Sequence, residues 1–313
     1  MTNFPLLTQL PGASRLILGC MGLGGGWNQE PVGEAELRKA REAVEAALSV
    51  GITLFDHADI YTHGKAEQVF GTLLSESPSL RDRLLLQSKC GIRFADEAGP
   101  GRYDLSAWYI ERSVEASLQR LRTDRLDLLL LHRPDPLVDV HELAESLSRL
   151  HRSGKVRCFG VSNMHAAQLA WLQSACSLPL AVNQLEMSLL RLDWLEAGTT
   201  FNDGAQGRAD AWAGTLEHCQ RQGVQLQAWG ALAQGRWREH AVAGTLQTMA
   251  ARLELVPETL LVAWLLRHPS CIQPVIGSTD PARIRACAAA LDVQLSREDW
   301  YALYVAARGR PLP

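Results

Sequence analysis

Eight short apolar runs alternate along this chain with longer segments of helical periodicity, and this alternation limits the fold more than any other feature. The runs expected as strands are Arg15–Gly19, Thr53–Asp56, Leu84–Lys89, Leu126–His132, Arg157–Val161, Leu180–Gln184, Gln225–Trp229 and Ile272–Ile276. Some of them, such as Leu128–Leu131, are continuously apolar, which is typical of parallel strands covered on both faces. Eight βα units predict an α/β protein of one domain, a closed (β/α)₈ TIM barrel spanning residues 1–313.

Helix signals lie between these runs. The segments expected as helices include Glu34–Val50, Ser106–Leu121, Asp139–Ser153 and Pro281–Leu291. Gly51 and Gly154 follow the ends of two of them, as glycine often does after a helix. Pro281 stands at the start of the last one, where a helix tolerates proline best.

The glycine run after the first strand does not form a dinucleotide-binding fingerprint. Gly22 and Gly24 start a G-x-G-x-x-G pattern, but Trp27 occupies its last position. An acidic residue at the end of the second strand, at the distance that the motif requires, is also lacking. A nicotinamide cofactor would therefore be held in another way.

Composition excludes several classes of protein. A chain of 313 residues can bury a large core, and a net charge of −3 provides no basic field for nucleic acid. Seven scattered cysteines without a C-x-x-C pair argue against a disulfide framework or a zinc site and favour a reducing compartment. Met1–Leu10 lacks the features of a signal peptide, and no apolar run reaches about 18 residues. We therefore expect a cytoplasmic protein without a membrane partner.

The longest stretch without periodicity, Glu196–Gly214, follows the sixth expected strand. It is rich in small and polar residues, and Phe201 and Trp212 are its only large apolar ones. Two interpretations stay open, a surface insertion and a functional lid over the mouth of the barrel.

Polar side chains gather at the ends of three successive strands, where TIM barrels carry their chemistry. Asp56 and Tyr61 follow the second strand, Lys89 ends the third, and His132 ends the fourth. Carbonyl reduction needs a proton at oxygen, and a phenol with a pKa near 10 is a weak donor at neutral pH. The ammonium of Lys89 would lower the pKa of Tyr61, with Asp56 holding Lys89 charged and His132 donating a hydrogen bond to the carbonyl oxygen.

These residues lie in strings that resemble the aldo-keto reductase family, and the resemblance runs from the first strand to the last helix. The most specific strings are FDHADIY, SKCGI, LHRPDP, GKVRCFGVSN and VNQLE. The resemblance implies a catalytic tetrad of Asp56, Tyr61, Lys89 and His132, and reduction of aldehydes or ketones with NADPH. The chain looks most similar to a bacterial branch with DHADIY and LHRPDPL motifs.

The same resemblance implies a site for NADPH. Ser162, Asn163 and Gln184 match residues that bind the carboxamide of the nicotinamide, and Trp229 matches the aromatic residue that stacks on its ring. The residues expected along the pyrophosphate are Gly22, Leu23, Gly230, Ala231, Leu232 and Ala233. Gly277, Ser278, Thr279 and Arg283 match the segment at the adenosine 2′-phosphate, where a guanidinium suits the phosphate. Asp56 is expected beside the nicotinamide as well.

Two departures from the family pattern concern this cofactor segment. Gly277 stands where the family has a lysine, and Ala286-Cys287 replaces its Glu-Asn pair at the adenine. Arg283 must therefore carry most of the preference for the 2′-phosphate. The chain also ends soon after its last helix, so any C-terminal specificity loop is short.

Other interpretations of the same residues remain. His57 and Asp59 flank the tetrad, but a metal site would need a third ligand, so no metal is expected. A nicotinamide-binding sensor with little turnover is one alternative function, and a Schiff-base enzyme using Lys89 is another. Some of four tryptophans expected in βα loops or at helix starts, Trp27, Trp108, Trp194 and Trp212, could line a substrate pocket, with packing as the simpler role. The expected partner is a small carbonyl substrate, and the chain is expected to be a monomer or a weak homo-oligomer.

Overall fold

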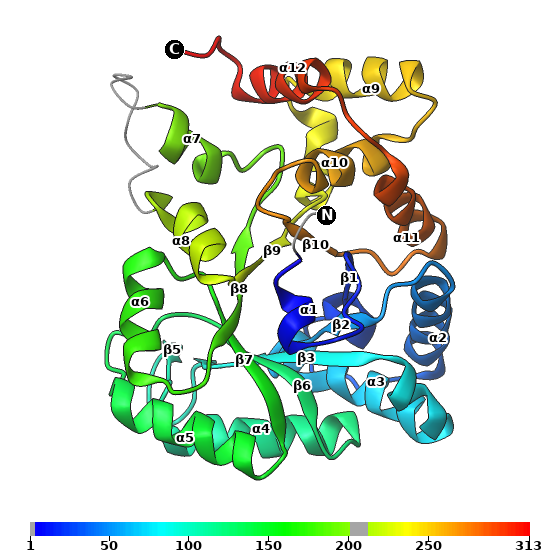
Figure 1. The fold of residues 1–313 in the computed structure, drawn as a ribbon. Helices are drawn as coiled ribbons and strands as arrows, with labels where there is room; N and C mark the ends of the chain where they lie inside the picture. Colours follow the sequence, from blue (N-terminus) through cyan, green and yellow to red (C-terminus); the bar gives the residue numbers. More distant parts are fainter. Residues whose placement is uncertain (1–3, 201–211) are drawn as a thin grey trace.

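A computed structural model of the chain describes residues 4–200 and 212–313. Eight parallel strands close into a barrel in the order β1-β10-β9-β8-β7-β6-β3-β2, surrounded by helices (Figure 1). The barrel strands are β1 Ile17–Gly19, β2 Leu54–Asp56, β3 Leu85–Cys90, β6 Leu126–Leu131, β7 Val156–Ser162, β8 Leu180–Glu186, β9 Gln225–Trp229 and β10 Gln273–Ile276. The predicted (β/α)₈ TIM barrel is confirmed, and each strand overlaps its predicted run.

The helices follow the strands in the expected alternation. They are α1 Leu6–Gln9, α2 Glu34–Ser49, α3 Lys65–Glu76, α4 Ala107–Leu121, α5 Val140–Arg152, α6 Ala166–Ala175, α7 Asp193–Thr199, α8 Thr215–Gln222, α9 Ala243–Arg252, α10 Pro257–Leu266, α11 Pro281–Ala288 and α12 Arg297–Arg308. Ser106 and Asp139 lie one residue before their helices, because their side chains accept hydrogen bonds from backbone N–H groups of the first turn. The last predicted helix divides into α11 and the 3₁₀ turn Ala289–Asp292.

Two of the elements that were not predicted from the sequence lie at opposite ends of the barrel. Helix α1 lies at the centre of the ring of elements in Figure 1 and packs on the amino ends of the strands, with Leu6 and Leu10 fully buried against Ile17 and Leu54. The second is a small hairpin after β3, formed by β4 Ile92–Arg93 and β5 Arg102–Tyr103. Both are too short to show a periodic pattern: packing against the barrel stabilises α1, and ion pairs of Arg93 and Arg102 with Asp96 stabilise the hairpin.

The segment Glu196–Gly214 is not wholly aperiodic. Its first residues belong to α7, and Glu196 accepts hydrogen bonds from the Tyr304 hydroxyl at 2.7 Å and from Arg308 Nε at 2.8 Å. This part of the prediction is corrected, because contacts with α12 stabilise a helix too short to be read from its own sequence. Residues 201–211, with Phe201, lie outside the described residues, so the choice between insertion and lid stays open.

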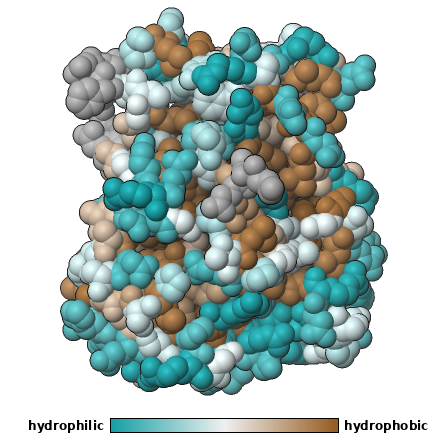
Figure 2. Space-filling model, viewed as in Figure 1, coloured by the Kyte–Doolittle hydropathy of each residue, from teal (hydrophilic) through white to brown (hydrophobic). Residues whose placement is uncertain are grey.

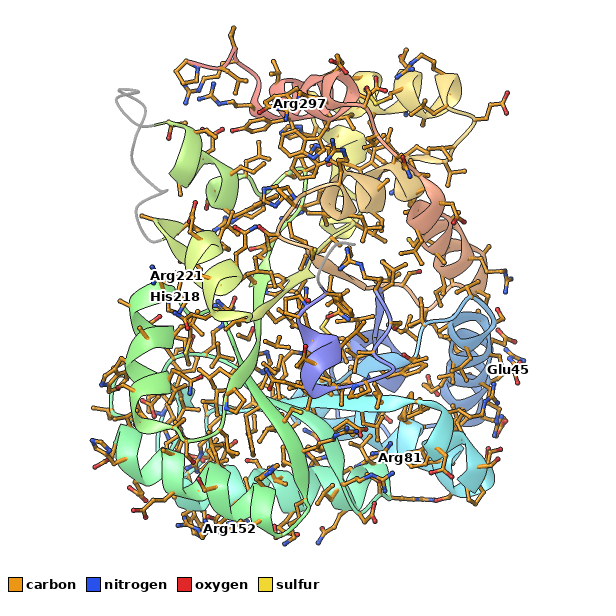
Figure 3. The ribbon with its side chains drawn as sticks, viewed as in Figure 1. Glu45, Arg81, Arg152, His218, Arg221 and Arg297 are labelled. Carbon is orange, nitrogen blue, oxygen red and sulfur yellow. The ribbon has the colours of Figure 1, made fainter. Side chains whose placement is uncertain are left out.

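The face of the molecule in Figure 2 carries both polar and apolar residues, which are interspersed. Charged residues such as Glu45 on α2 and Arg152 on α5 lie on the outer side of the ring of helices (Figure 3). Within residues 4–200 and 212–313, no helix has the length and apolar character needed to cross a membrane.

Candidate active site

Three neighbouring strands bring the predicted tetrad together at their carboxyl ends. Lys89 Nζ lies 2.7 Å from both carboxylate oxygens of Asp56 and donates to the Tyr61 hydroxyl at 2.9 Å. Asp56 and Lys89 are buried, with exposures of 2% and 1%, while Tyr61 is partly accessible. His132 follows β6 directly, and its ring centroid lies 6.2 Å from that of Tyr61 in an edge-on arrangement. The four side chains therefore form one connected group at the mouth of the barrel.

The charges in this group determine which reactions it can support. Burial lowers the pKa of Lys89, but Asp56 and Tyr61 outweigh that effect, so the net direction is upward. A Schiff-base lysine needs a lowered pKa, so Lys89 is poorly suited to the aldolase alternative. Burial raises the pKa of Tyr61 more than Lys89 lowers it. This net direction is opposite to the sequence argument, which considered the ammonium and not the burial of the phenol.

His132 is a neutral imidazole. Burial lowers its pKa to about 2, with further contributions from Lys89 and Arg133. A neutral imidazole carries one N–H donor, which suits hydrogen bonding to a carbonyl oxygen better than proton release.

His57 and Asp59 flank the tetrad in the sequence, and each has an environment that differs from that of the tetrad. His57 is fully buried, packs edge-on against Phe70 with centroids 4.7 Å apart, and has a pKa lowered by burial to about 3. Burial, followed by the charge of Glu67, raises the pKa of Asp59 to about 8, and its Oδ1 has no hydrogen-bond partner within the described residues. The described part of the chain contains no group of three or more His, Cys, Asp or Glu residues placed to hold a metal ion.

A second group of predicted residues lies beside the tetrad on β7, β8 and β9. The Asn163 amide donates to the His132 carbonyl at 3.2 Å and to Ser162 Oγ at 2.8 Å, and Trp229 Nε1 donates to Asn163 Oδ1 at 3.2 Å. Gln184 Nε2 donates to Asp56 Oδ1 at 3.2 Å. Thus the residues expected at the nicotinamide are joined to the tetrad through hydrogen bonds.

The segments expected at the phosphates have the open backbone that a phosphate group requires. A Cβ atom on Gly22 would meet only the Thr279 side chain, at 3.3 Å, and one on Gly277 would meet nothing within 4 Å. Gly22 and Thr279 therefore lie side by side, on the loops after β1 and β10. Arg283, near the start of α11, is exposed, and no carboxylate of the described residues forms an ion pair with it.

The turn after β9 shapes the remaining part of this site. Gly230 has a φ of +72°, and the Ala233 N–H donates to its carbonyl at 2.7 Å. Ala231 and Ala233 are buried, whereas Gly230 and Leu232 are partly accessible. Leu23 has an exposure of 0%, so neither its side chain nor its backbone is accessible, and its expected contact with the pyrophosphate stays a prediction. The partly accessible Gly230 and Leu232 and the open backbone at Gly22 and Gly277 leave room for an extended dinucleotide along the loops after β1, β9 and β10.

Comparison with known proteins agrees with this geometry. The model of the aldo/keto reductase family matches residues 15–306, which is nearly the whole barrel. The chain belongs to the aldo/keto reductase family.

Relatives of known name support the assignment. This aldo-keto reductase is 38% identical over 304 residues to a 6-dehydroglucose reductase of Agrobacterium fabrum, with 95% of each chain covered. It is 37% identical to oxidoreductase YdhF of Escherichia coli, with 97% of each chain covered. Among solved structures, an aldo-keto reductase from Klebsiella pneumoniae in complex with NADPH is 27% identical with a TM-score of 0.73, covering 96% of this chain and 92% of that one.

The aldo-keto reductase carries an aromatic cluster at its rim that the sequence interpretation found only in part. Trp27 lies edge-on to His63 and Phe94, with centroids at 5.8 and 6.5 Å, and the three side chains come from the loops after β1, β2 and β3. Trp27 is 51% exposed and Phe94 45% exposed, so both are available to a substrate.

Of the other three tryptophans that the sequence interpretation considered, two pack against the core and one lies on the surface. Trp194 is buried against Trp264, and Trp212 packs on the main core. Trp108 is exposed, with the guanidinium of Arg112 over its ring.

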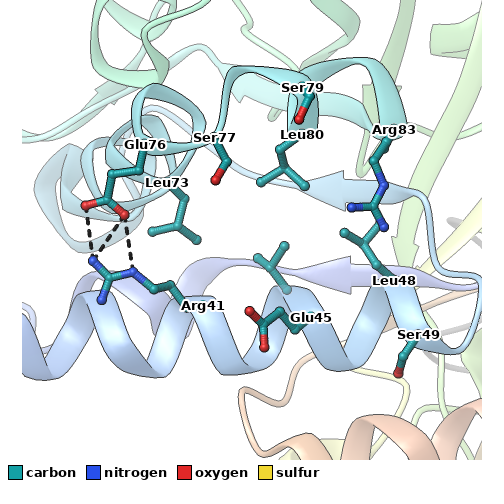
Figure 4. A pocket seen from close by; sticks show the side chains of 11 residues that line it. Arg41, Glu45, Leu48, Ser49, Leu73, Glu76, Ser77, Ser79, Leu80 and Arg83 are labelled. Carbon is teal, nitrogen blue, oxygen red and sulfur yellow. Dashed lines mark hydrogen bonds and ion pairs between the residues drawn. The ribbon is translucent and has the colours of Figure 1, made fainter.

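A groove of about 470 Å³ between α2 and α3 lies on the outside of the barrel (Figure 4). Arg41 crosses one end of it and bonds to Glu76. None of its lining residues belongs to the tetrad or to the predicted cofactor positions. It therefore takes no part in the candidate site.

Proposed function

We propose that this protein reduces aldehyde or ketone carbonyls to alcohols with NADPH, and that Tyr61 donates the proton. The observation that carries the proposal is the Asp56–Lys89–Tyr61 chain, in which one ammonium bonds both carboxylate oxygens at 2.7 Å and the phenol at 2.9 Å. Because Lys89 donates to the Tyr61 oxygen, the hydroxyl hydrogen is free to be donated to a substrate oxygen.

Each tetrad side chain has a separate task in this proposal. Tyr61 moves a proton from its hydroxyl to the carbonyl oxygen of the substrate, and Lys89 stabilises the negative charge left on the phenol oxygen. Asp56 keeps Lys89 charged and fixed, as the short distances between them require. The neutral imidazole of His132 donates a hydrogen bond that orients the carbonyl oxygen.

NADPH supplies the hydride when it is bound. We place its carboxamide at Ser162, Asn163 and Gln184, with Trp229 against its ring and its pyrophosphate over the loops after β1 and β9. Ser278, Thr279 and Arg283 would hold the 2′-phosphate, for which the exposed guanidinium of Arg283 is the best placed charge. The similar aldo-keto reductase from Klebsiella pneumoniae that was solved in complex with NADPH supports the choice of this cofactor.

The proposal extends to the setting of the enzyme. We infer a small-molecule carbonyl substrate, a monomer or weak homo-oligomer, and a cytoplasmic location. All seven cysteines are unpaired thiols, which is consistent with a reducing compartment. The name of the Agrobacterium fabrum relative makes 6-dehydroglucose the first substrate to examine.

A substrate panel tests the proposal directly. We expect the purified protein to oxidise NADPH, and NADH more slowly, with at least one of 6-dehydroglucose, simple aldehydes, ketones and open-chain sugars. Alcohol formation in a one-to-one ratio with NADPH consumed would support carbonyl reduction. A sensor would instead bind NADPH and show no turnover above the no-substrate rate with any member of the panel.

A further inference from the structure

The centre of the barrel contains a cluster of amide side chains. Four glutamines fill it, Gln87 of β3, Gln184 of β8, Gln227 of β9 and Gln273 of β10, and none is more than 2% exposed. The interior layers of such barrels are usually packed by branched apolar side chains. Buried amides are costly unless they are hydrogen-bonded, so their partners show what the cluster does.

Gln87 and Gln227 bond to each other across the barrel. β3 and β9 stand on opposite sides of the closed order of strands. Gln87 Nε2 lies 3.0 Å from Gln227 Oε1, and Gln227 Nε2 lies 2.9 Å from Gln87 Oε1. The two amides thus form a reciprocal pair along a diameter of the barrel.

Neighbouring side chains extend this pair toward both ends of the barrel. Gln227 Nε2 also donates to Gln273 Oε1 at 3.1 Å, and Gln273 Nε2 donates to the Ser14 carbonyl at 2.6 Å, below the amino end of β1. In the other direction, Gln87 Nε2 donates to Asp56 Oδ1. A continuous chain of hydrogen bonds therefore runs from the amino ends of the strands, which α1 covers, to the tetrad.

The strand register fixes the end of this line at the tetrad. Asp56 and Gln87 are direct partners across β2 and β3, and Gln87 precedes Lys89 by two residues, so both side chains face the barrel interior. Asp56 Oδ1 accepts from Lys89, Gln87 and Gln184 together. Neutral N–H donors stabilise a carboxylate and leave its charge in place, so Asp56 can still hold Lys89.

We propose that Gln87 is a positioning residue that aligns Asp56 and, through it, Lys89 and Tyr61, and that Gln227 fixes Gln87 from the opposite strand. This inference rests on the proposed function, since it concerns the same proton donor. Without the amide, Asp56 would lose one neutral donor and could rotate away from Lys89. The ammonium would then no longer be held at 2.9 Å from the phenol.

Three methionine variants test the proposal, because methionine keeps the length of glutamine and removes its amide. Gln87→Met should lower kcat about 10- to 100-fold, as for loss of a hydrogen bond to a charged group, with the KM for NADPH changed less than about twofold. The alkaline limb of its kcat profile should move upward, because Lys89 lowers the pKa of the Tyr61 phenol and would no longer be held close to it. Gln227→Met should show the same shift to a smaller extent, and the double variant should be less affected than the product of the two single effects.

Gln225→Met is the matched control. Gln225 is a buried glutamine on the same strand as Gln227, but its amide donates to the backbone carbonyls of Leu226 and Cys271. We expect it to lower thermal stability and to leave the pH profile unchanged. Equal profile shifts in Gln87→Met and Gln225→Met would assign a general packing role to the amides and overturn the proposal.

Two further outcomes separate the possible failures. If Gln87→Met does not fold, Gln227→Met decides, and an unshifted alkaline limb in that variant overturns the inference. If Tyr61→Phe is inactive while Gln87→Met has the wild-type profile and kcat, only the positioning role is wrong. If Tyr61→Phe is fully active, the proposed function itself fails.

Discussion

Lys89 Nζ lies 2.9 Å from the hydroxyl oxygen of Tyr61. This contact joins the last residue but one of β3 to a residue in the loop after β2. It depends on the parallel pairing of the two strands, in which Asp56 lies opposite Gln87, two residues before Lys89. The same pairing lets Lys89 bond to both the Asp56 carboxylate and the Tyr61 phenol. The first prediction follows from this chain of contacts.

Tyr61→Phe should reduce kcat about 10²- to 10⁴-fold, because phenylalanine keeps the ring and removes the only proton that Tyr61 can donate. The dissociation constant of NADPH, measured by fluorescence titration, should stay within about twofold of the wild-type value. More than about a tenth of wild-type turnover in the variant would exclude Tyr61 as the proton donor.

Arg283→Ala should weaken NADPH binding about 10- to 100-fold, because the variant lacks the guanidinium that would bind the 2′-phosphate. NADH has no 2′-phosphate, so its binding should stay nearly unchanged. Titration of both cofactors against the wild type measures the effect. Arg285→Ala, two residues further along α11, is the matched control and should leave both affinities in place. Equal losses for NADPH and NADH in Arg283→Ala would point to a role in the fold of α11 instead.

Asp59→Asn should stabilise the protein increasingly as the pH rises from about 4 to about 8. The folded state raises the pKa of Asp59 to about 8, so the folded protein binds this proton more tightly than the unfolded chain does. The stability that this proton contributes is present at low pH and is lost as the pH rises through that range. The asparagine side chain of the variant does not titrate, so the variant has no such loss. The difference in the free energy of unfolding between the variant and the wild type should therefore grow by up to about 1.4 kcal/mol per pH unit.

Urea unfolding of both proteins at pH 5, 6, 7 and 8 measures that difference. Asp124→Asn is a suitable control, since the Asp124 side chain is 82% exposed. A constant difference between Asp59→Asn and wild type across the four pH values would contradict the raised pKa.

Gly71→Ala should destabilise the protein by about 1–3 kcal/mol, as overpacking does in other tightly packed interiors. A Cβ atom at Gly71 would lie 2.1 Å from the backbone carbonyl oxygen of Arg120, so α3 and α4 would have to separate. Gly244→Ala on α9 provides the comparison, because a Cβ there meets nothing within 4 Å. We expect that change to be neutral or stabilising by up to about 1 kcal/mol, since alanine is the better helix former. Equal transition temperatures for the two variants would show that the α3–α4 contact is looser than described.

Local sequence determined the strands and the positions of the candidate catalytic residues at the strand ends. The apolar runs are strong signals because a strand buried on both faces is mostly apolar, and Leu128–Leu131 of β6 is such a run. The repeated alternation left few topologies other than a barrel, and a barrel places the ends of its strands together. For that reason Asp56, Tyr61, Lys89 and His132 could be grouped from their positions at strand ends alone.

Tertiary structure decided what depends on contacts between distant residues. Helix α1 exists because Leu6 and Leu10 close the end of the barrel, and α7 because Glu196 bonds to Tyr304 and Arg308. The net direction of the Tyr61 pKa follows from burial, which no spacing along the chain reveals. The partnership of Gln87 with Gln227 joins residues 140 positions apart, and only closure of the barrel brings β3 and β9 face to face.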